Sequence, residues 1–175
     1  VELQRRLRLL GLARPVASCQ AIYLRFHAKQ LAGYEIEERS AVLYHTIDRI
    51  AELGGSHLAL ASELGDDRLG ILVLGSEPIG PEGTRLAQTV SDYLRRQFGI
   101  VHWIGIGRTT TSPTTCSVSY HEAEEAASSA FFLDRTVVEV AHVGPSSGTE
   151  ADVPHAYRKT IVDALQIGRA SCRER

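Results

Sequence analysis

Two neighbouring segments decide the fold, Phe98-Gly-Ile-Val-His-Trp-Ile-Gly-Ile-Gly-Arg108 and Ser119-Tyr-His-Glu-Ala-Glu-Glu-Ala126. The first predicts a strand over residues 100–107, because β-branched and aromatic residues suit a pleated surface. Gly105 and Gly107 carry no Cβ, so another backbone can approach this strand closely. The segment therefore predicts a strand made for close contact with a neighbouring element.

The second segment predicts a helix that runs to about Phe132. It opens with the pattern S-x-x-E, which is typical of a capping box, so we expect Ser119 and Glu122 to satisfy free amides at the start of this helix. Small residues recur along one face, which would let the helix lie very close to the sheet. These residues are Ala123, Ala126, Ala127 and Ala130.

Hydrophobic patterns on either side predict the remaining elements. Apolar residues at steps of three and four indicate helices, and short β-branched or alternating runs indicate strands. A polar turn at 64–68 separates two strands and indicates a hairpin, which we expect at the centre of the sheet. The expected strands cover 19–27, 57–63, 69–75, 100–107 and 136–143, and the helices cover 37–53, 84–98 and 119–132. This order predicts an α+β fold with a βαββαβ core, a mainly antiparallel sheet and helices packed on it.

Composition limits the class of protein. The chain has 175 residues, 43% of them hydrophobic and 23% charged, and a formal net charge of −2. These values fit one globular domain, and no apolar run is long enough to span a bilayer. We therefore expect a soluble, cytoplasmic protein with no membrane contact. The lack of excess positive charge also argues against direct binding of nucleic acid by this chain.

Cysteine and histidine spacing gives no sign of a metal or cofactor. The three cysteines, Cys19, Cys116 and Cys172, contain no C-x-x-C pair, so reduced, buried thiols are favoured over a disulfide framework or a zinc site. The seven histidines show no metal-ligand spacing. We expect no bound cofactor and no metal ligand.

The chain divides into four parts. Residues 1–17 are interpreted as an incoming helical linker and residues 18–143 as the globular domain. Residues 144–166 read as a linker and the start of a further C-terminal domain, which we expect to be a helix-turn-helix domain. Residues 167–175 resemble a translated sequencing adapter and carry no argument.

The two quoted segments, together with Phe131-Phe-Leu-Asp134, resemble the signature of GGDEF-like domains in bacterial regulators. The resemblance covers about residues 18–143 and implies a GGDEF-like core, which is ferredoxin-like or nucleotidyl-cyclase-like. Its structural signature falls on Gly105, Gly107, Ser119, Tyr120, Glu122 and Ala123. The chain is most similar to the segment between receiver and helix-turn-helix domains in AraC-type response regulators. The central domain of sugar-diacid or purine-catabolism type activators is the next most similar.

The residues that the resemblance assigns to catalysis are poorly matched. Leu64-Gly65-Asp66-Asp67-Arg68 stands at the GGDEF position, with Leu in place of the first Gly and Arg in place of the final Phe. Gly65, Asp66 and Asp67 are therefore interpreted as a degenerate motif that forms a polar turn. The metal-binding Asp that the family carries at the end of its first strand is replaced by Leu24-Arg25-Phe26-His27, and Ala28-Lys29-Gln30 does not match the residues expected next. We expect no catalytic residue and no enzyme activity.

These observations predict a non-catalytic signal-relay and dimerisation domain of a bacterial transcription regulator. The resemblance implies a homodimer, an upstream receiver or sensor domain and a downstream DNA-binding domain. The alternative is a sensor in which the former nucleotide pocket binds a small molecule without converting it. An active diguanylate cyclase is the third hypothesis.

Overall fold

The computed structural model describes residues 16–54, 57–65, 67–112 and 115–142. Contacts divide the chain into a unit of residues 1–144 and a unit of residues 145–175, and the second unit lies outside the described residues. The expected linkers at 1–17 and 144–166 fall wholly or largely outside them, as do the segment 167–175 and Asp66.

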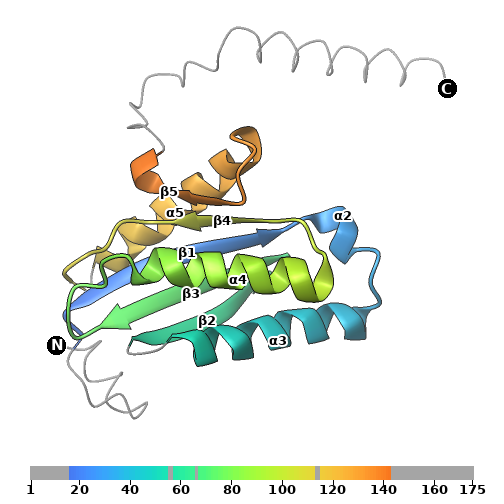
Figure 1. The fold of residues 1–175 in the computed structure, drawn as a ribbon, viewed down its shortest axis with the longest axis horizontal. Coiled ribbons are helices and arrows are strands. Elements are labelled where there is room, and N and C mark those ends of the chain that lie inside the picture. Colours follow the sequence, from blue (N-terminus) through green and yellow to red (C-terminus); the bar gives the residue numbers. More distant parts are fainter. Residues whose placement is uncertain (1–15, 55–56, 66, 113–114, 143–175) are drawn as a thin grey trace, which may run out of the picture. The chain divides into compact units, whose positions relative to one another are not determined.

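Five strands form one mixed sheet in the order β2-β3-β1-β4-β5 (Figure 1). The strands are β1 (Ser18–Phe26), β2 (Leu58–Gly65), β3 (Arg68–Gly75), β4 (His102–Ile106) and β5 (Val137–Glu139). The helices are α2 (Ala28–Leu31), α3 (Ile36–Leu53), α4 (Glu82–Phe98) and α5 (Cys116–Phe132). All neighbouring strands are antiparallel except β4 and β5. The structure confirms the predicted α+β class and the mainly antiparallel sheet.

Strand β1 lies at the centre of the sheet, and both of its faces are covered. Because successive side chains of a strand point to opposite faces, Ile22 and Leu24 join the core beneath α3 and α4, whereas Ala21 and Tyr23 pack against α5. Figure 1 shows α4 crossing the near face of the sheet. The predicted hairpin forms as β2 and β3, but β2 is an edge strand, so the expectation of a central hairpin is wrong.

Helix α5 lies directly on β4, as the glycine and alanine pattern predicts. A Cβ atom at Gly105 would lie 1.8 Å from the carbonyl oxygen of Ala123 and 2.3 Å from the amide nitrogen of Ala127. A Cβ atom at Gly107 would lie 1.9 Å from the carbonyl oxygen of Ser119. These distances are far below van der Waals contact, so only glycine fits at either position.

The ends of two elements differ from the sequence-based expectation. Helix α5 begins at Cys116 with Thr115 as its N-cap, one turn before the predicted capping box, so Ser119 does not cap it. A capping box instead starts α3, between Glu35 and Glu38. The predicted strand over 136–143 is shorter, because β5 passes into a 3-10 turn over Val140–His142.

The expectation of reduced thiols is also wrong in the structure, where Cys19 and Cys116 form a disulfide. The two Cα atoms are 6.3 Å apart and the residues are separated by 97 positions in sequence. Cys19 lies in β1 and Cys116 opens α5, so this bond joins the central strand to the first turn of the helix. Sequence spacing could not reveal the pair, because it depends on how α5 returns to β1.

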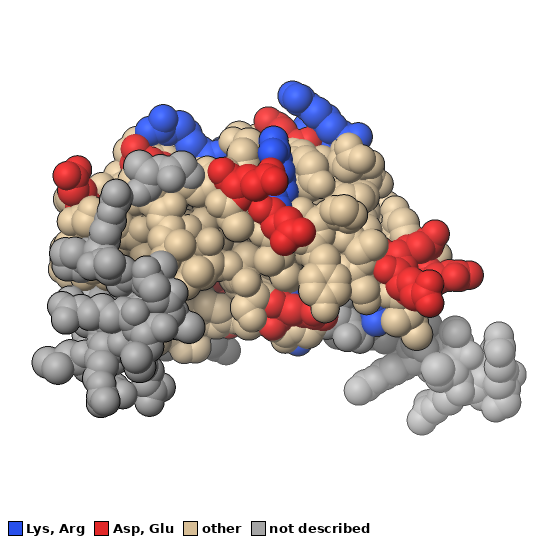
Figure 2. All heavy atoms as spheres, turned by 90° about the horizontal axis from the view of Figure 1, so that it is seen from below, with Lys and Arg blue, Asp and Glu red and all other residues tan. Residues whose placement is uncertain are grey.

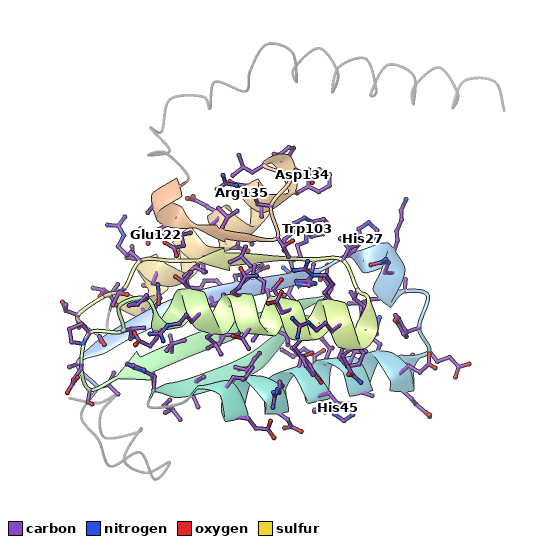
Figure 3. All side chains as sticks on the ribbon, viewed as in Figure 1. His27, His45, Trp103, Glu122, Asp134 and Arg135 are labelled. Atoms are coloured by element: carbon purple, nitrogen blue, oxygen red, sulfur yellow. A yellow bond between two sulfur atoms is a disulfide. The ribbon has the colours of Figure 1, made fainter. Side chains whose placement is uncertain are left out.

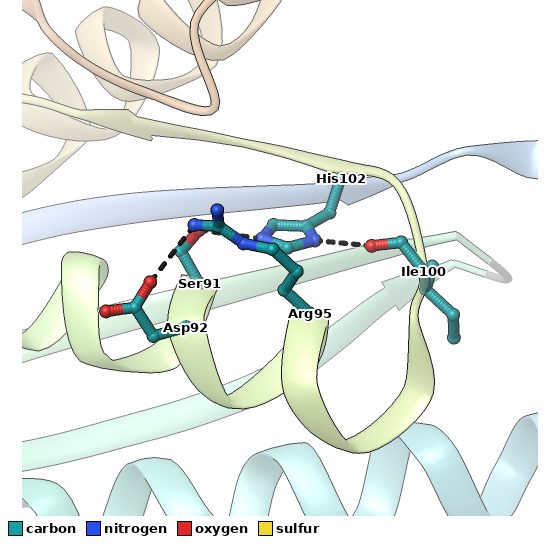
Figure 4. A network of polar contacts seen from close by, with 5 residues as sticks. All are labelled: Ser91, Asp92, Arg95, Ile100 and His102. Atoms are coloured by element: carbon teal, nitrogen blue, oxygen red, sulfur yellow. Dashed lines mark hydrogen bonds and ion pairs between the residues drawn. The ribbon is translucent and has the colours of Figure 1, made fainter.

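A buried histidine connects α4 to β4 (Figure 4). His102 is 4% exposed, and its Nδ1 lies 2.8 Å from the carbonyl oxygen of Ile100 while its Nε2 lies 3.0 Å from Ser91 Oγ. A carbonyl only accepts, so Nδ1–H donates to it and Nε2 accepts from the serine hydroxyl. Burial lowers the pKa of His102 and the charge of Arg95 adds to this effect, although the hydrogen bond to Ile100 opposes it. The structure therefore favours neutral His102.

We expect acidification to destabilise the domain through His102. Its folded-state pKa lies below the unfolded value of about 6.5, so between these values the unfolded chain binds more protons. The free energy of unfolding should fall as the pH drops below about 6.5 and level off below the folded-state pKa. Urea unfolding of the wild type and His102→Gln over a pH series measures this contribution. A decline of equal size in both proteins would contradict it.

Candidate functional site

The end of β1 carries polar side chains on the face that α5 covers elsewhere. In β1, which the structure describes completely, Arg25 is the single exposed residue. It is aligned with Arg68 of β3 on one side and with Trp103 of β4 on the other. Residues paired across strands share a face, so these three side chains form a row across the sheet.

The hairpin turn supplies a carboxylate to this row. Asp67 Oδ2 lies 3.8 Å from Arg25 Nε, and Asp67 Oδ1 lies 3.3 Å from Arg68 Nε. The Asp67 carbonyl also accepts a hydrogen bond of 2.8 Å from the Phe26 amide. Gly65, at φ +146, permits the tight turn before them. The described part of the segment 64–68 is therefore a hairpin turn, and the Asp67 carboxylate is already paired with two guanidinium groups.

These residues do not fit a magnesium site. Magnesium prefers an octahedral shell of oxygen ligands, which proteins supply mainly through carboxylates. The side chains of Leu24 and Phe26, at the end of β1, are buried in the core and contain no oxygen. Among the residues with described positions, no group of three or more His, Cys, Asp or Glu side chains could hold a metal ion.

A cavity of about 410 Å³ lies beside this row. It is bounded by the end of β1, the start of α2, Trp103 of β4 and the last turns of α5. Figure 3 shows His27 and Trp103 at this same end of the sheet, and their ring centroids are 5.9 Å apart. The Trp103 ring meets the Phe131 ring edge to face at 5.5 Å. The lining consists of Arg25, Phe26, His27, Ala28, Lys29, Trp103, Ala127, Ser128, Phe131 and Phe132.

The signature residues of α5 do not line this cavity; they attach the helix to the sheet and the neighbouring loop. The buried Ser119 Oγ accepts a hydrogen bond of 2.9 Å from the Ala21 amide. Glu122 accepts one of 3.0 Å from the Arg108 amide and also pairs with the Arg108 guanidinium. The serine and glutamate pattern thus has a different role from the predicted cap, because α5 begins one turn earlier.

Tyr120 completes this attachment. Its ring meets that of Tyr23 edge to face at 5.8 Å, and burial, followed by Tyr23 and Glu124, raises the pKa of Tyr120. Beside the hairpin, the hydrogen bond that the Arg68 guanidinium donates to Tyr23, and then the charges of Tyr23 and Asp67, raise the pKa of Arg68. Tyr23 therefore contacts groups from both α5 and the hairpin.

Sequence reasoning missed Trp103, Lys29 and Phe131 as parts of one site. One signal was available: Trp103 lies two residues before Gly105 and so shares its face of β4. Helix α5 therefore packs on the bare backbone of Gly105 and, two residues earlier in β4, beside the large indole of Trp103. In the sequence, Arg25 and His27 indicate the loss of a metal-binding carboxylate, but no pattern indicates that they line a cavity.

Comparisons with known proteins agree with this architecture. The family model described as "GGDEF-like domain" matches residues 1–129. The structure of an EAL/GGDEF domain protein from M. capsulatus is similar, with a TM-score of 0.53 and 18% identity over 76% of this chain and 93% of that one. The active GGEEF domain of a diguanylate cyclase from Vibrio cholerae gives a TM-score of 0.56 and 11% identity, over 79% and 90% of the two chains.

The GGDEF domain of DgcB from Caulobacter crescentus, solved in complex with c-di-GMP, gives a TM-score of 0.54 and 11% identity over 80% of this chain and 85% of that one. No match is found among curated protein sequences. At these identities the structural likenesses show the fold alone, and they confirm the expected nucleotidyl-cyclase-like core.

We expect Ser119→Ala to destabilise the domain. The substitution leaves the Ala21 amide buried without an acceptor, which costs about 1–3 kcal/mol. Ser128→Ala is the matched control, because the exposed Ser128 hydroxyl donates to the Glu124 carbonyl of the same helix. Its effect should stay within about 0.5 kcal/mol. Urea unfolding compares the two variants, and equal losses would contradict a specific role for Ser119.

Proposed function

Since the chain belongs to the GGDEF-like domain family, we propose that it is a non-catalytic signal-relay and dimerisation domain of a bacterial transcription regulator. The observation that carries the proposal is the absence of a metal-binding carboxylate at the end of β1, which the structure describes completely. Leu24 and Phe26 are buried, and Arg25 places a guanidinium beside the hairpin carboxylate of Asp67. This arrangement supports a role that needs no metal ion.

Exposed apolar side chains support contact with another protein surface. Ile36 is 76% exposed and Tyr44 is 66% exposed, and both lie on α3. Burying such side chains against a second copy of the chain would remove apolar surface from water. A homodimer formed through α3 fits a domain that passes a signal between an input domain and a DNA-binding domain.

Surface charge supports the proposal that DNA contact belongs to another domain. On the face shown in Figure 2, the described Lys and Arg side chains form small separate groups with acidic side chains between them. Non-specific DNA binding requires clustered positive charge to neutralise phosphates.

Among the described residues, no helix has the length and apolar character to cross a bilayer.

We expect no cyclic dinucleotide when the protein is incubated with GTP and Mg²⁺. Asp67 is engaged by two arginines, and the residues beside it provide no second carboxylate from β1. Mass spectrometry of the reaction, with an active diguanylate cyclase as the positive control, checks this. Product that disappears in an Asp67→Asn variant would identify a working cyclase and overturn the proposal. Product that persists unchanged in that variant would indicate a contaminating cyclase.

The regulator context predicts the domains encoded on either side. Reading the contiguous genomic DNA should show a receiver or sensor domain upstream and a helix-turn-helix domain downstream of Gln166. A stop codon soon after the codon for Gln166, with no partner domain upstream, would contradict the proposal.

A further inference from the structure

We propose that the cavity between the end of β1 and the last turns of α5 binds a small planar aromatic anion without a metal ion. The inference rests on the proposed non-catalytic role and adds a ligand class to it. It depends on three properties of the cavity: the charge of its lining, its aromatic walls and a histidine nitrogen with no partner.

The lining is positively charged. Arg25 and Lys29 contribute cations, and none of the ten lining residues, all of which the structure describes, carries a carboxylate. Asp67 partly offsets the charge of Arg25 from outside the cavity, at 3.8 Å, whereas the Lys29 side chain is exposed. An anionic group would therefore be attracted to the β1–α2 side of the cavity. A metal ion would be repelled there.

Three aromatic side chains also line the cavity. Trp103 is half-buried, and the rings of Phe131 and Phe132 follow it with centroids 5.5 Å and 5.3 Å apart in succession. Phe131 is 62% exposed and Phe132 is 66% exposed, so both leave large apolar surfaces in water. A flat ring placed against them would bury this surface and make favourable aromatic contacts. A sugar or an aliphatic acid would gain less from such a wall.

His27 adds a further polar group to the lining. Its Nδ1 is buried and makes no hydrogen bond, and its ring lies 5.9 Å from that of Trp103. A buried polar nitrogen without a partner is unfavourable. A turn of the imidazole about the Cβ–Cγ bond would present this nitrogen to the cavity, where an anionic oxygen could accept its hydrogen. By contrast, the Ser128 hydroxyl is already used, since it donates to the Glu124 carbonyl.

The size of the cavity limits the ligand. A volume of about 410 Å³ lies at the small end of the range for small-molecule sites, about 300–1,000 Å³. It accommodates one or two fused rings with one acidic group. Carboxylate and phosphate share the chemistry that Arg25 and Lys29 would recognise, and separate probes distinguish them.

Benzoate and phenyl phosphate are the probes, titrated into the whole chain in the presence of EDTA. Isothermal calorimetry measures affinity, and the fluorescence of Trp103, the only tryptophan of the chain, reports on the cavity itself. We expect saturable binding of at least one probe with a change in Trp103 emission. Cyclohexanecarboxylate, which has the charge but no aromatic ring, should bind at least tenfold more weakly.

Variants locate the binding. Phe131→Ala and Lys29→Gln should each lower the affinity for the probe at least fivefold. Both side chains are exposed, so the fold should persist. Val118→Ala is the control, because it removes an exposed apolar side chain from α5, the same helix, outside the cavity. Circular dichroism checks that all three variants are folded.

Several results would overturn the inference. These are the absence of saturable binding of both probes at millimolar concentration, equal binding of cyclohexanecarboxylate, a requirement for Mg²⁺, and full affinity in Phe131→Ala. If Phe131→Ala instead reduces self-association and no probe binds, the aromatic wall is a protein contact and the ligand site does not exist. None of these outcomes depends on GTP turnover, so the ligand site and the non-catalytic role can fail separately.

Discussion

The structure depends on the contact between the backbone of α5 and the backbone of β4. At Gly105 and Gly107 the helix lies so close that a single methyl group would collide with main-chain atoms. Such a contact leaves no space for side chains, so hydrogen bonds at the edges of the contact set the position of the helix. Ser119 supplies one to the central strand, and Glu122 supplies another to the loop after β4. The disulfide between Cys19 and Cys116 also joins α5 to the central strand β1.

This close packing also accounts for the cavity. Trp103 occupies the same face of β4 as Gly105, two residues earlier, so the surface beneath α5 changes from bare backbone to an indole ring. At that end the helix closes with Phe131 and Phe132, and Arg25 is the side chain of β1 that reaches solvent. Glycine contacts thus fix the first part of α5 on the sheet, and a cavity with cationic and aromatic lining lies beside its last turns. Ser119 and Glu122, which attach α5 to the rest of the fold, do not line the cavity, whereas Ala127 both lies against Gly105 and lines the cavity.

Much of the fold could be predicted from local patterns. The strand and helix periodicities placed β1, α3, α4 and α5 within a few residues of their observed positions, because burial of one face imposes a regular spacing. The alanine face of α5 and the two glycines of β4 correctly indicated close contact. The role of Ser119 and Glu122 could not be predicted in the same way. The S-x-x-E pattern has the same form whether it caps a helix or bonds to a strand, and only the start of α5 at Cys116 distinguishes the two.

By itself, the sequence determined most of the strands and helices, the α+β class of the domain, and the absence of a carboxylate side chain at the end of the first strand. The tertiary structure decided which distant residues meet. Arg25, His27, Trp103 and Phe131 come from three separate elements and share no pattern that could be recognised along the chain. The pairing of Asp67 with two arginines, and of Cys19 with Cys116, likewise required strand register and helix placement. Local patterns reflect the burial of one element at a time, whereas a site arises where several elements end together.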